Sequence, residues 1–197
     1  MLAVAVATAG AAGEPASDAT VLVEATAVVA GLQLDLRYAT NHNLTGTALY
    51  HSVRCLLLPQ TAAALAKAQA LLIAKGLRLV AWDCYRPQRV QWLLWKRAPT
   101  PGLVANPKRG SNHSRGAAVD VTLSRADGTA VEMPTDFDDF SPAAARAATD
   151  GLSAQALENR GILRQAMREA GFTTISKEWW HFDLAGALRL PVLTEEL

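Results

Sequence analysis

The chain has 197 residues, of which 50% are hydrophobic and 19% are charged, and its formal net charge is +1 at pH 7. This length and composition are typical of a single domain that buries a core of its own without help from disulfides. Because lysines and arginines are scattered along the chain, we expect neither a nucleic-acid partner nor a basic surface for anionic membranes.

Residues 1–12 are small and apolar, and Glu14 and Pro15 follow them. This run is too short to span a bilayer, so no integral membrane segment is predicted. It resembles the apolar part and small-residue end of a secretory signal, although it lacks a basic start. We expect residues 1–22 to be the remnant of an export signal or, alternatively, a flexible tail. The first interpretation implies a periplasmic or exported protein, and the second fits a cytoplasmic one.

Residues 23–197 show alternating strand and helix signals and are predicted to form one domain. Strands are expected within 28–38 and over 78–84, 117–123, 172–176 and 180–184, and helices over 59–75, 87–97 and 153–170. The proline-containing segment 98–110 is expected to be a loop at the rim of the site. The pattern predicts an α+β fold with a central antiparallel or mixed sheet, helices packed on one face and metal ligands on the other.

Two cysteines, Cys55 and Cys84, are too few for a disulfide framework and lack the spacing of a metal finger. Whether they pair is left open by the sequence. No internal repeat and no signal for the oligomeric state were found.

Two imidazoles and two carboxylates stand out in the motifs 111–120 (SNHSRGAAVD) and 178–181 (EWWH). His113, Asp120 and His181 are candidate ligands of one zinc ion, because a catalytic zinc takes three protein ligands and keeps a position for water. Zinc bound in this way lowers the pKa of that water from about 15.7 towards 7. Alternatively, the histidines lie in polar loops and the aspartate forms a salt bridge, but four such residues together favour the metal site.

The local pattern around Asp120 supports this interpretation. In the expected strand 117–123, Asp120 lies on the face opposite Val119 and Val121. A carboxylate in so apolar a strand needs a charge partner, because burial of an unpaired charge is very costly. Gly116 allows a turn just before the strand, which would bring His113 back towards Asp120.

The role of Glu178 is less constrained by spacing. Glu178 lies three positions before His181, so in an extended segment the two side chains would point to opposite faces. A bend or bulge near Trp179 and Trp180 would place both beside one metal ion. Glu178 is either a general base, which we favour, or a ligand that leaves Asp120 outside the shell. The tryptophan pair is interpreted as core packing.

The metal motif, Ser-x-His-x-x-Gly-x-Ala-x-Asp with a later Glu-x-Trp-His, resembles that of zinc peptidases acting on D-alanyl peptides and peptidoglycan. Within that group the chain is most similar to the D-alanyl-D-alanine dipeptidases of VanX type. Two further segments carry this closer similarity, 36–46 (LRYATNHNLTG) and 82–87 (WDCYRP). The resemblance runs from about residue 34 to residue 181 and beyond. Cys84 departs from it, because many relatives have glycine there.

The resemblance implies that His113, Asp120 and His181 bind zinc, that Glu178 is the general base, and that Arg86 stabilises the tetrahedral intermediate. A fixed guanidinium near the metal can hold a developing oxyanion. The alternative for Arg86 is an ion pair with Asp83 at the end of a strand.

Three other residues match substrate-contacting positions of the family: Tyr38, Ser111 and Asp138. Asp138 is one of three aspartates in 136–139, so a slip of one or two positions would change this assignment. We expect Asp138 to pair with the substrate ammonium group.

The implied activity is zinc-dependent hydrolysis of the dipeptide D-Ala-D-Ala to two D-Ala. A D,D-carboxypeptidase or peptidoglycan endopeptidase with the same zinc site is the alternative within the enzyme class. The alternative from another class is a non-catalytic binding module with a structural metal. Glu178 and Arg86 favour an enzyme, because a structural metal site needs neither a base nor an oxyanion partner.

Overall fold

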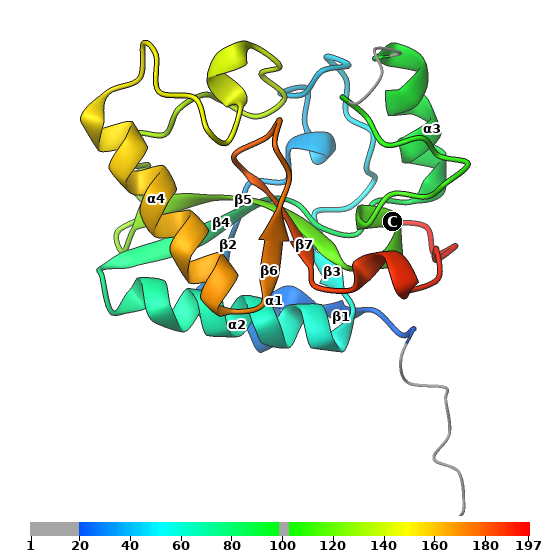
Figure 1. Cartoon of the computed structure of the whole chain (residues 1–197). Coiled ribbons are helices and arrows are strands. Elements are labelled where there is room, and N and C mark those ends of the chain that lie inside the picture. The colour runs from blue at the N-terminus through cyan, green and yellow to red at the C-terminus, as the bar shows by residue number, and fades with distance from the viewer. Residues whose placement is uncertain (1–19, 99–102) are drawn as a thin grey trace, which may run out of the picture.

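A five-stranded sheet with the order β2-β4-β5-β7-β6 forms the centre of the computed structural model, which describes residues 20–98 and 103–197 (Figure 1). β2 runs parallel to β4, and the other neighbours are antiparallel. The strands are β2 (Gln33–Leu34), β4 (Leu77–Asp83), β5 (Ala118–Arg125), β6 (Phe172–Thr174) and β7 (His181–Leu184). A separate antiparallel ribbon pairs β1 (Val23–Glu24) with β3 (Leu56–Leu57). The sheet is therefore mixed.

Two long helices pack against the sheet and against each other (Figure 1). α2 (Pro59–Ile73) contacts β4, and α4 (Ala154–Glu169) contacts β5 and β6. The Oγ of Ser153 accepts a hydrogen bond of 3.0 Å from the Ala156 N–H and so caps α4. The predicted α+β class, with a mixed sheet and packed helices, is confirmed.

The other helical segments are short and lie mostly in the loops around the site. They are α1 (Ala25–Val28), α3 (Gln88–Arg97) and the 3-10 turns Arg37–Ala39, His113–Arg115, Pro142–Ala144 and Ala187–Arg189. The strand expected within 28–38 is thus reduced to β2. The prediction was too long because a helical turn precedes β2 and a 3-10 turn follows it.

A disulfide joins Cys55, which precedes β3, to Cys84, which follows β4. Both half-cystines are buried. The bond therefore ties the carboxyl end of β4 to the neighbouring ribbon, which answers the question that the sequence left open.

Aromatic rings fill the core beneath the loops. Trp179 and Trp180 are 2% and 1% exposed, and the centroids of their rings lie 5.5 Å apart. Trp82 packs against both. Both rings belong to the hydrophobic core, as interpreted from the sequence, and Trp180 also lines the cavity of the candidate site.

The expectation for residues 1–22 falls mainly on residues 1–19, which lie outside the described residues. Leu22 packs against the small apolar group of Leu56, Leu58, Tyr85 and Leu193. Within 20–98 and 103–197, none of the helices has the length and apolar character needed to cross a membrane.

Candidate metal centre and substrate pocket

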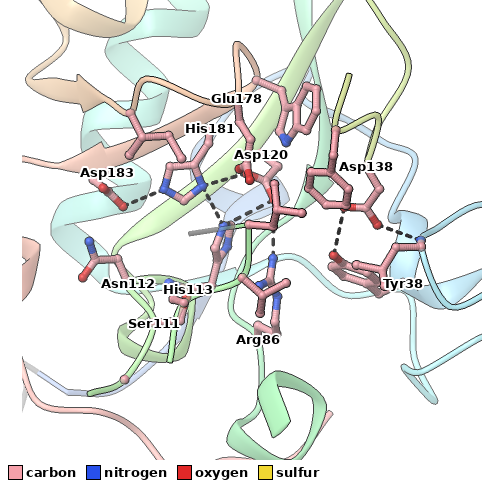
Figure 2. Close-up of a pocket in the computed structure, with 18 of the residues that line it drawn as sticks. Tyr38, Arg86, Ser111, Asn112, His113, Asp120, Asp138, Glu178, His181 and Asp183 are labelled. Carbon is pink, nitrogen blue, oxygen red and sulfur yellow. Dashed lines mark hydrogen bonds and ion pairs between the residues drawn. The ribbon is translucent and has the colours of Figure 1, made fainter. Parts of the chain in front are cut away.

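A cavity of about 280 Å³ opens among the loops beside β5 and β7 (Figure 2). Side chains from distant parts of the sequence line it. They include all eight residues singled out from the sequence: Tyr38, Arg86, Ser111, His113, Asp120, Asp138, Glu178 and His181. The tertiary structure therefore brings the whole predicted set to one place.

The backbone pairing of three strands brings the metal-binding side chains together. Asp120 of β5 lies opposite His181 of β7 and, on its other side, opposite Asp83 of β4. His113 lies in the 3-10 turn before β5, and the next turn is made by Gly116 with φ 64°. That left-handed conformation is one that glycine adopts without steric cost, and it returns the chain to β5 as predicted.

Ligand atoms of His113, Asp120 and His181 lie within 4.8 Å of one another. The Nδ1 of His181 lies 2.9 Å from the Asp120 Oδ1 and 3.2 Å from the His113 Nε2 (Figure 2). The His113 Nε2 lies 3.3 Å from the Asp120 Oδ2. Two imidazole nitrogens and one carboxylate thus converge, which is a donor set suited to zinc.

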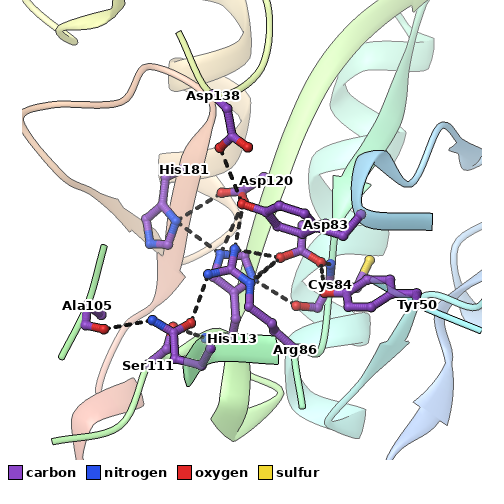
Figure 3. Close-up of polar contacts among 12 residues, drawn as sticks. Tyr50, Asp83, Cys84, Arg86, Ala105, Ser111, His113, Asp120, Asp138 and His181 are labelled. Carbon is purple, nitrogen blue, oxygen red and sulfur yellow. Dashed lines mark hydrogen bonds and ion pairs between the residues drawn. The ribbon is translucent and has the colours of Figure 1, made fainter. Parts of the chain in front are cut away.

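The other nitrogen of each ring has a partner of its own. The His113 Nδ1 lies 2.7 Å from the carbonyl oxygen of Cys84 (Figure 3), and the His181 Nε2 lies 2.9 Å from the Asp183 Oδ1. A carbonyl oxygen only accepts, so the His113 Nδ1 carries the hydrogen and its Nε2 keeps a lone pair for a metal. The donor set therefore fits a metal ion.

The charges around the centre favour an ionised Asp120. Burial raises the pKa of Asp120, but His113 and His181 outweigh it and hold this pKa well below its usual range. Burial lowers the pKa of His181, whereas its hydrogen bonds to Asp120 and Asp183 raise it well above its usual value. An ionised carboxylate is the form that a metal ligand requires.

Arg86 is held by a network of buried polar groups at the edge of the cavity (Figure 3). Its Nε donates to the Asp83 Oδ2 at 2.8 Å, its Nη2 forms an ion pair with the same oxygen at 2.6 Å, and its Nη1 donates to the Gln91 Oε1 at 2.9 Å. Its Nη2 also lies 3.5 Å from the Asp120 Oδ2. The ion pair with Asp83 that the sequence offered as an alternative is present, yet Arg86 still lines the cavity. The two interpretations are compatible, because Asp83 fixes the guanidinium.

Asp138 and Tyr38 form another part of the wall (Figure 2). The Tyr38 hydroxyl donates to the Asp138 Oδ1 at 3.3 Å, and the Leu44 N–H donates to its Oδ2 at 2.9 Å. Asp138 has φ 56°, an uncommon conformation for a residue other than glycine and one that concentrates at functional sites. Burial raises the pKa of Asp138 to about 6, although the bond from Leu44 opposes this.

Glu178 lies in the connection between β6 and β7. The chain bends at Trp179 and Trp180, and both Glu178 and His181 line the cavity. This is the bend that the sequence required if the two side chains were to share one site. Burial raises the pKa of Glu178 to about 7, while the nearby His181 lowers it. A carboxyl group that titrates near neutrality suits proton transfer.

Three polar residues of the site were not singled out from the sequence: Gln91, Asn112 and Asp183. Asp83 and Gln91 hold Arg86, while Asn112 and Asp183 line the cavity. Asp183 had a detectable signal, because it follows His181 by two positions in a predicted strand and so shares its face. Asp83 had been named from the sequence as a possible ion-pair partner of Arg86, whereas Gln91 had no signal beyond its proximity in the sequence.

The fold and the site together define a metallopeptidase. A family model described as D-ala-D-ala dipeptidase, of peptidase family M15, matches residues 18–195. The chain belongs to this family, and the resemblance found in the sequence is confirmed.

Curated relatives match over most of the chain. It is 39% identical over 180 residues to a D-alanyl-D-alanine dipeptidase of Escherichia coli (strain K12), covering 91% of this chain and 93% of that protein. It is 36% identical over 181 residues to one of Enterococcus faecium, covering 80% and 88%. Among solved structures, VanYB in complex with D-Alanine-D-Alanine aligns with a TM-score of 0.45 and 17% identity, over 70% of this chain and 76% of that chain.

Proposed function

We propose that this protein is a zinc-dependent dipeptidase that hydrolyses D-Ala-D-Ala to two molecules of D-Ala. One observation carries the proposal: a single cavity holds a three-residue metal donor set together with Glu178, Arg86 and Asp138. Membership of the dipeptidase family, and relatives that carry the name D-alanyl-D-alanine dipeptidase, support this substrate.

In this proposal His113, Asp120 and His181 hold one zinc ion per chain. The chemistry that zinc supplies when bound is Lewis-acid polarisation of the scissile carbonyl and acidification of a water molecule. Binding of zinc would displace the extra proton that the raised pKa of His181 otherwise retains, so two neutral imidazoles and one carboxylate would leave the centre with a net positive charge, which favours both effects.

Glu178 acts as the general base. Its carboxylate takes a proton from the attacking water and later delivers it to the leaving amine nitrogen. A pKa near 7 supports both transfers, because at neutral pH neither the gain nor the loss of the proton costs Glu178 much free energy. Glu178 is not part of the donor set found among the described residues, which supports the role of base over that of ligand.

Arg86 binds the negative charge that develops on the carbonyl oxygen of the substrate. Asp83 and Gln91 already hold its guanidinium, so little reorganisation accompanies this interaction. Burial lowers the pKa of Arg86, but Asp83 and its other neighbours raise it well above the usual value. The side chain therefore stays charged throughout the reaction.

Asp138 pairs with the free ammonium group of the dipeptide, and Tyr38 and Ser111 make further polar contacts with the substrate. The position of Asp138 supports this role, because its carboxylate lines the same cavity as the metal donors. A requirement for a free ammonium group separates a dipeptidase from an enzyme that trims longer peptides.

The experiment that tests the proposal is mass spectrometry of the products from three substrates: D-Ala-D-Ala, N-acetyl-D-Ala-D-Ala and a longer stem peptide. We expect cleavage of the free dipeptide and much lower kcat/KM for the acetylated one, which leaves the carboxylate of Asp138 unsatisfied. Comparable kcat/KM for the two dipeptides would favour a carboxypeptidase, and cleavage within the stem peptide an endopeptidase. Zinc binding without hydrolysis of any substrate would favour the binding module.

We also propose that residues 23–197 form one catalytic domain that acts in the periplasm or another exported location. The Cys55–Cys84 disulfide supports this, because disulfides form and persist in oxidising compartments. Cell fractionation combined with thiol alkylation tests it. Recovery of the chain from the cytoplasm with both thiols reduced would contradict the proposal and favour the cytoplasmic alternative.

A further inference from the structure

Asp183 contacts a proposed metal ligand from the side that faces away from the metal. Its Oδ1 lies 2.9 Å from the His181 Nε2, while the Nδ1 of the same ring faces His113 and Asp120 (Figure 2). The two nitrogens point in different directions, so one metal ion cannot bind both His181 Nδ1 and Asp183. Asp183 is accordingly outside the donor set found among the described residues.

The tautomer of His181 depends on this contact. A neutral imidazole has one N–H and one lone pair, so His181 can offer Nδ1 to a metal only when Nε2 carries the hydrogen. The Asp183 carboxylate only accepts, and it therefore favours that tautomer.

The backbone holds Asp183 in place. β7 lies between β5 and β6, and Asp183 is paired with Ala118 on one side and with Thr173 on the other. The side chain of Asp183 is 17% exposed, which limits the competition of water with His181 for its carboxylate. Because residues two apart in a strand share a face, the strand itself directs Asp183 and His181 to the same side.

The two histidines are oriented by different means. The outer nitrogen of His113 lies 2.7 Å from the backbone carbonyl oxygen of Cys84 and only 3.5 Å from the Asp83 carboxylate, whereas that of His181 lies 2.9 Å from the Asp183 carboxylate. A side-chain carboxylate adds a negative charge, which increases the basicity of the ring nitrogen that faces the metal. It is also the partner that substitution can remove without altering the backbone.

We infer that Asp183 is a positioning residue, which fixes the tautomer and the orientation of His181 and thereby strengthens metal binding. This inference rests on the proposed zinc site. It assigns Asp183 no contact with the substrate.

The test measures the zinc dissociation constant of the whole protein by competition with a chromogenic chelator. We expect Asp183→Ala to weaken zinc binding by about 10–100-fold, the usual effect of removing such a partner. Asp183→Asn should lose less, because its amide oxygen still accepts the hydrogen bond but carries no charge. Asp150→Asn is the matched control, since Asp150 is exposed and lies outside the cavity.

Thermal unfolding of the metal-free variants separates positioning from stability. An unchanged zinc dissociation constant in Asp183→Ala would overturn the inference, whether or not the unfolding temperature falls. If Asp183→Ala does not fold, Asp183→Asn decides the question. Should Asp183→Asn fold and bind zinc with an unchanged dissociation constant, Asp183 would have a structural role only. Failure of the unsubstituted protein to bind zinc would instead contradict the proposed function itself.

Discussion

The two ends of the cavity are built in different ways. At the metal end, two of the three donors, Asp120 and His181, lie opposite each other on paired strands, and His113 lies in the 3-10 turn just before β5. At the other end, Tyr38 lies in a 3-10 turn and Asp138 in an irregular segment with φ 56°, where the Leu44 N–H and the Tyr38 hydroxyl hold it. Metal donors require a geometry held to within about 0.5 Å, which strands supply better than loops. Substitutions at the two ends should therefore have separable effects.

The largest effect is expected from removing a metal donor. His181→Ala should reduce the zinc content from about one per chain to near zero and abolish hydrolysis, while circular dichroism stays close to that of the unsubstituted protein. The helices and sheet should persist because their core lies outside the donor set. His113→Ala should behave alike.

His42→Ala is the matched control, because His42 is exposed and does not line the cavity. Metal content measured by atomic emission, together with activity in a chelator, decides the outcome. A protein purified without metal that remains fully active in chelator would contradict the metal site.

The next largest effect is expected at Glu178. Glu178→Gln should keep zinc but lower kcat by about 10²–10⁴-fold, the usual contribution of a positioned base. The exposed Glu158→Gln on α4 should leave both unchanged. Loss of zinc in Glu178→Gln would mean that Glu178 is a ligand and that Asp120 has another role.

A smaller effect, confined to recognition of the substrate, is expected from substitution of Asp138. Asp138→Asn should lower kcat/KM for free D-Ala-D-Ala by about 10–100-fold, since a hydrogen bond to a charged group contributes about 1.5–3 kcal/mol. Zinc content should not change and kcat/KM for N-acetyl-D-Ala-D-Ala should not fall, because the variant has no carboxylate left unsatisfied, so the preference for the free dipeptide should largely disappear.

Asp139→Asn is the control for the neighbouring aspartate, and we expect it to resemble the unsubstituted protein. If Asp139→Asn alone lowered kcat/KM for the free dipeptide, the contact with the ammonium group would be assigned to Asp139 in place of Asp138. Reduced zinc content in Asp138→Asn would show that the two ends of the cavity are not independent.

The smallest effect is a pH dependence that belongs to the ammonium end. Burial raises the pKa of Asp138 to about 6, so the carboxylate is ionised above that pH and becomes neutral as the pH falls through it. The ratio of kcat/KM between the unsubstituted protein and Asp138→Asn should be highest between about pH 6 and pH 8, because the amino group of the dipeptide loses its charge at about pH 8. The ratio should fall by up to about tenfold per unit below pH 6. Both proteins are measured with excess zinc, and because both contain Glu178, the titration of Glu178 cancels in the ratio. A ratio that does not change with pH would contradict the proposed role of Asp138.

The sequence predicted the members of the site better than the contacts among them. His113, Asp120, Glu178 and His181 were found because two short motifs carry chemically distinctive side chains, and all four line one cavity. The bend at Trp179 and Trp180 was not itself predicted; the sequence showed only that such a bend was needed if Glu178 and His181 were to share one site. The roles of these residues remain predictions for the experiments above.

Other features lay beyond prediction from local patterns. The strand expected within 28–38 was reduced to Gln33–Leu34, since alternating leucines do not reveal where helical turns interrupt a segment. The pairing of Cys55 with Cys84 requires two segments to meet in space, and the sequence contains no distance between them.

The sequence by itself determined the family, the fold class and the candidate donors, because strand and helix periodicity and short motifs depend on neighbouring residues. Only the tertiary structure decided which group faces each side chain. It placed the Cys84 carbonyl against His113, Asp83 against Arg86 and Asp183 against His181. The physical reason is that tautomer, charge and orientation depend on contacts of about 3 Å, and these are set by the packing of elements that are distant in the chain.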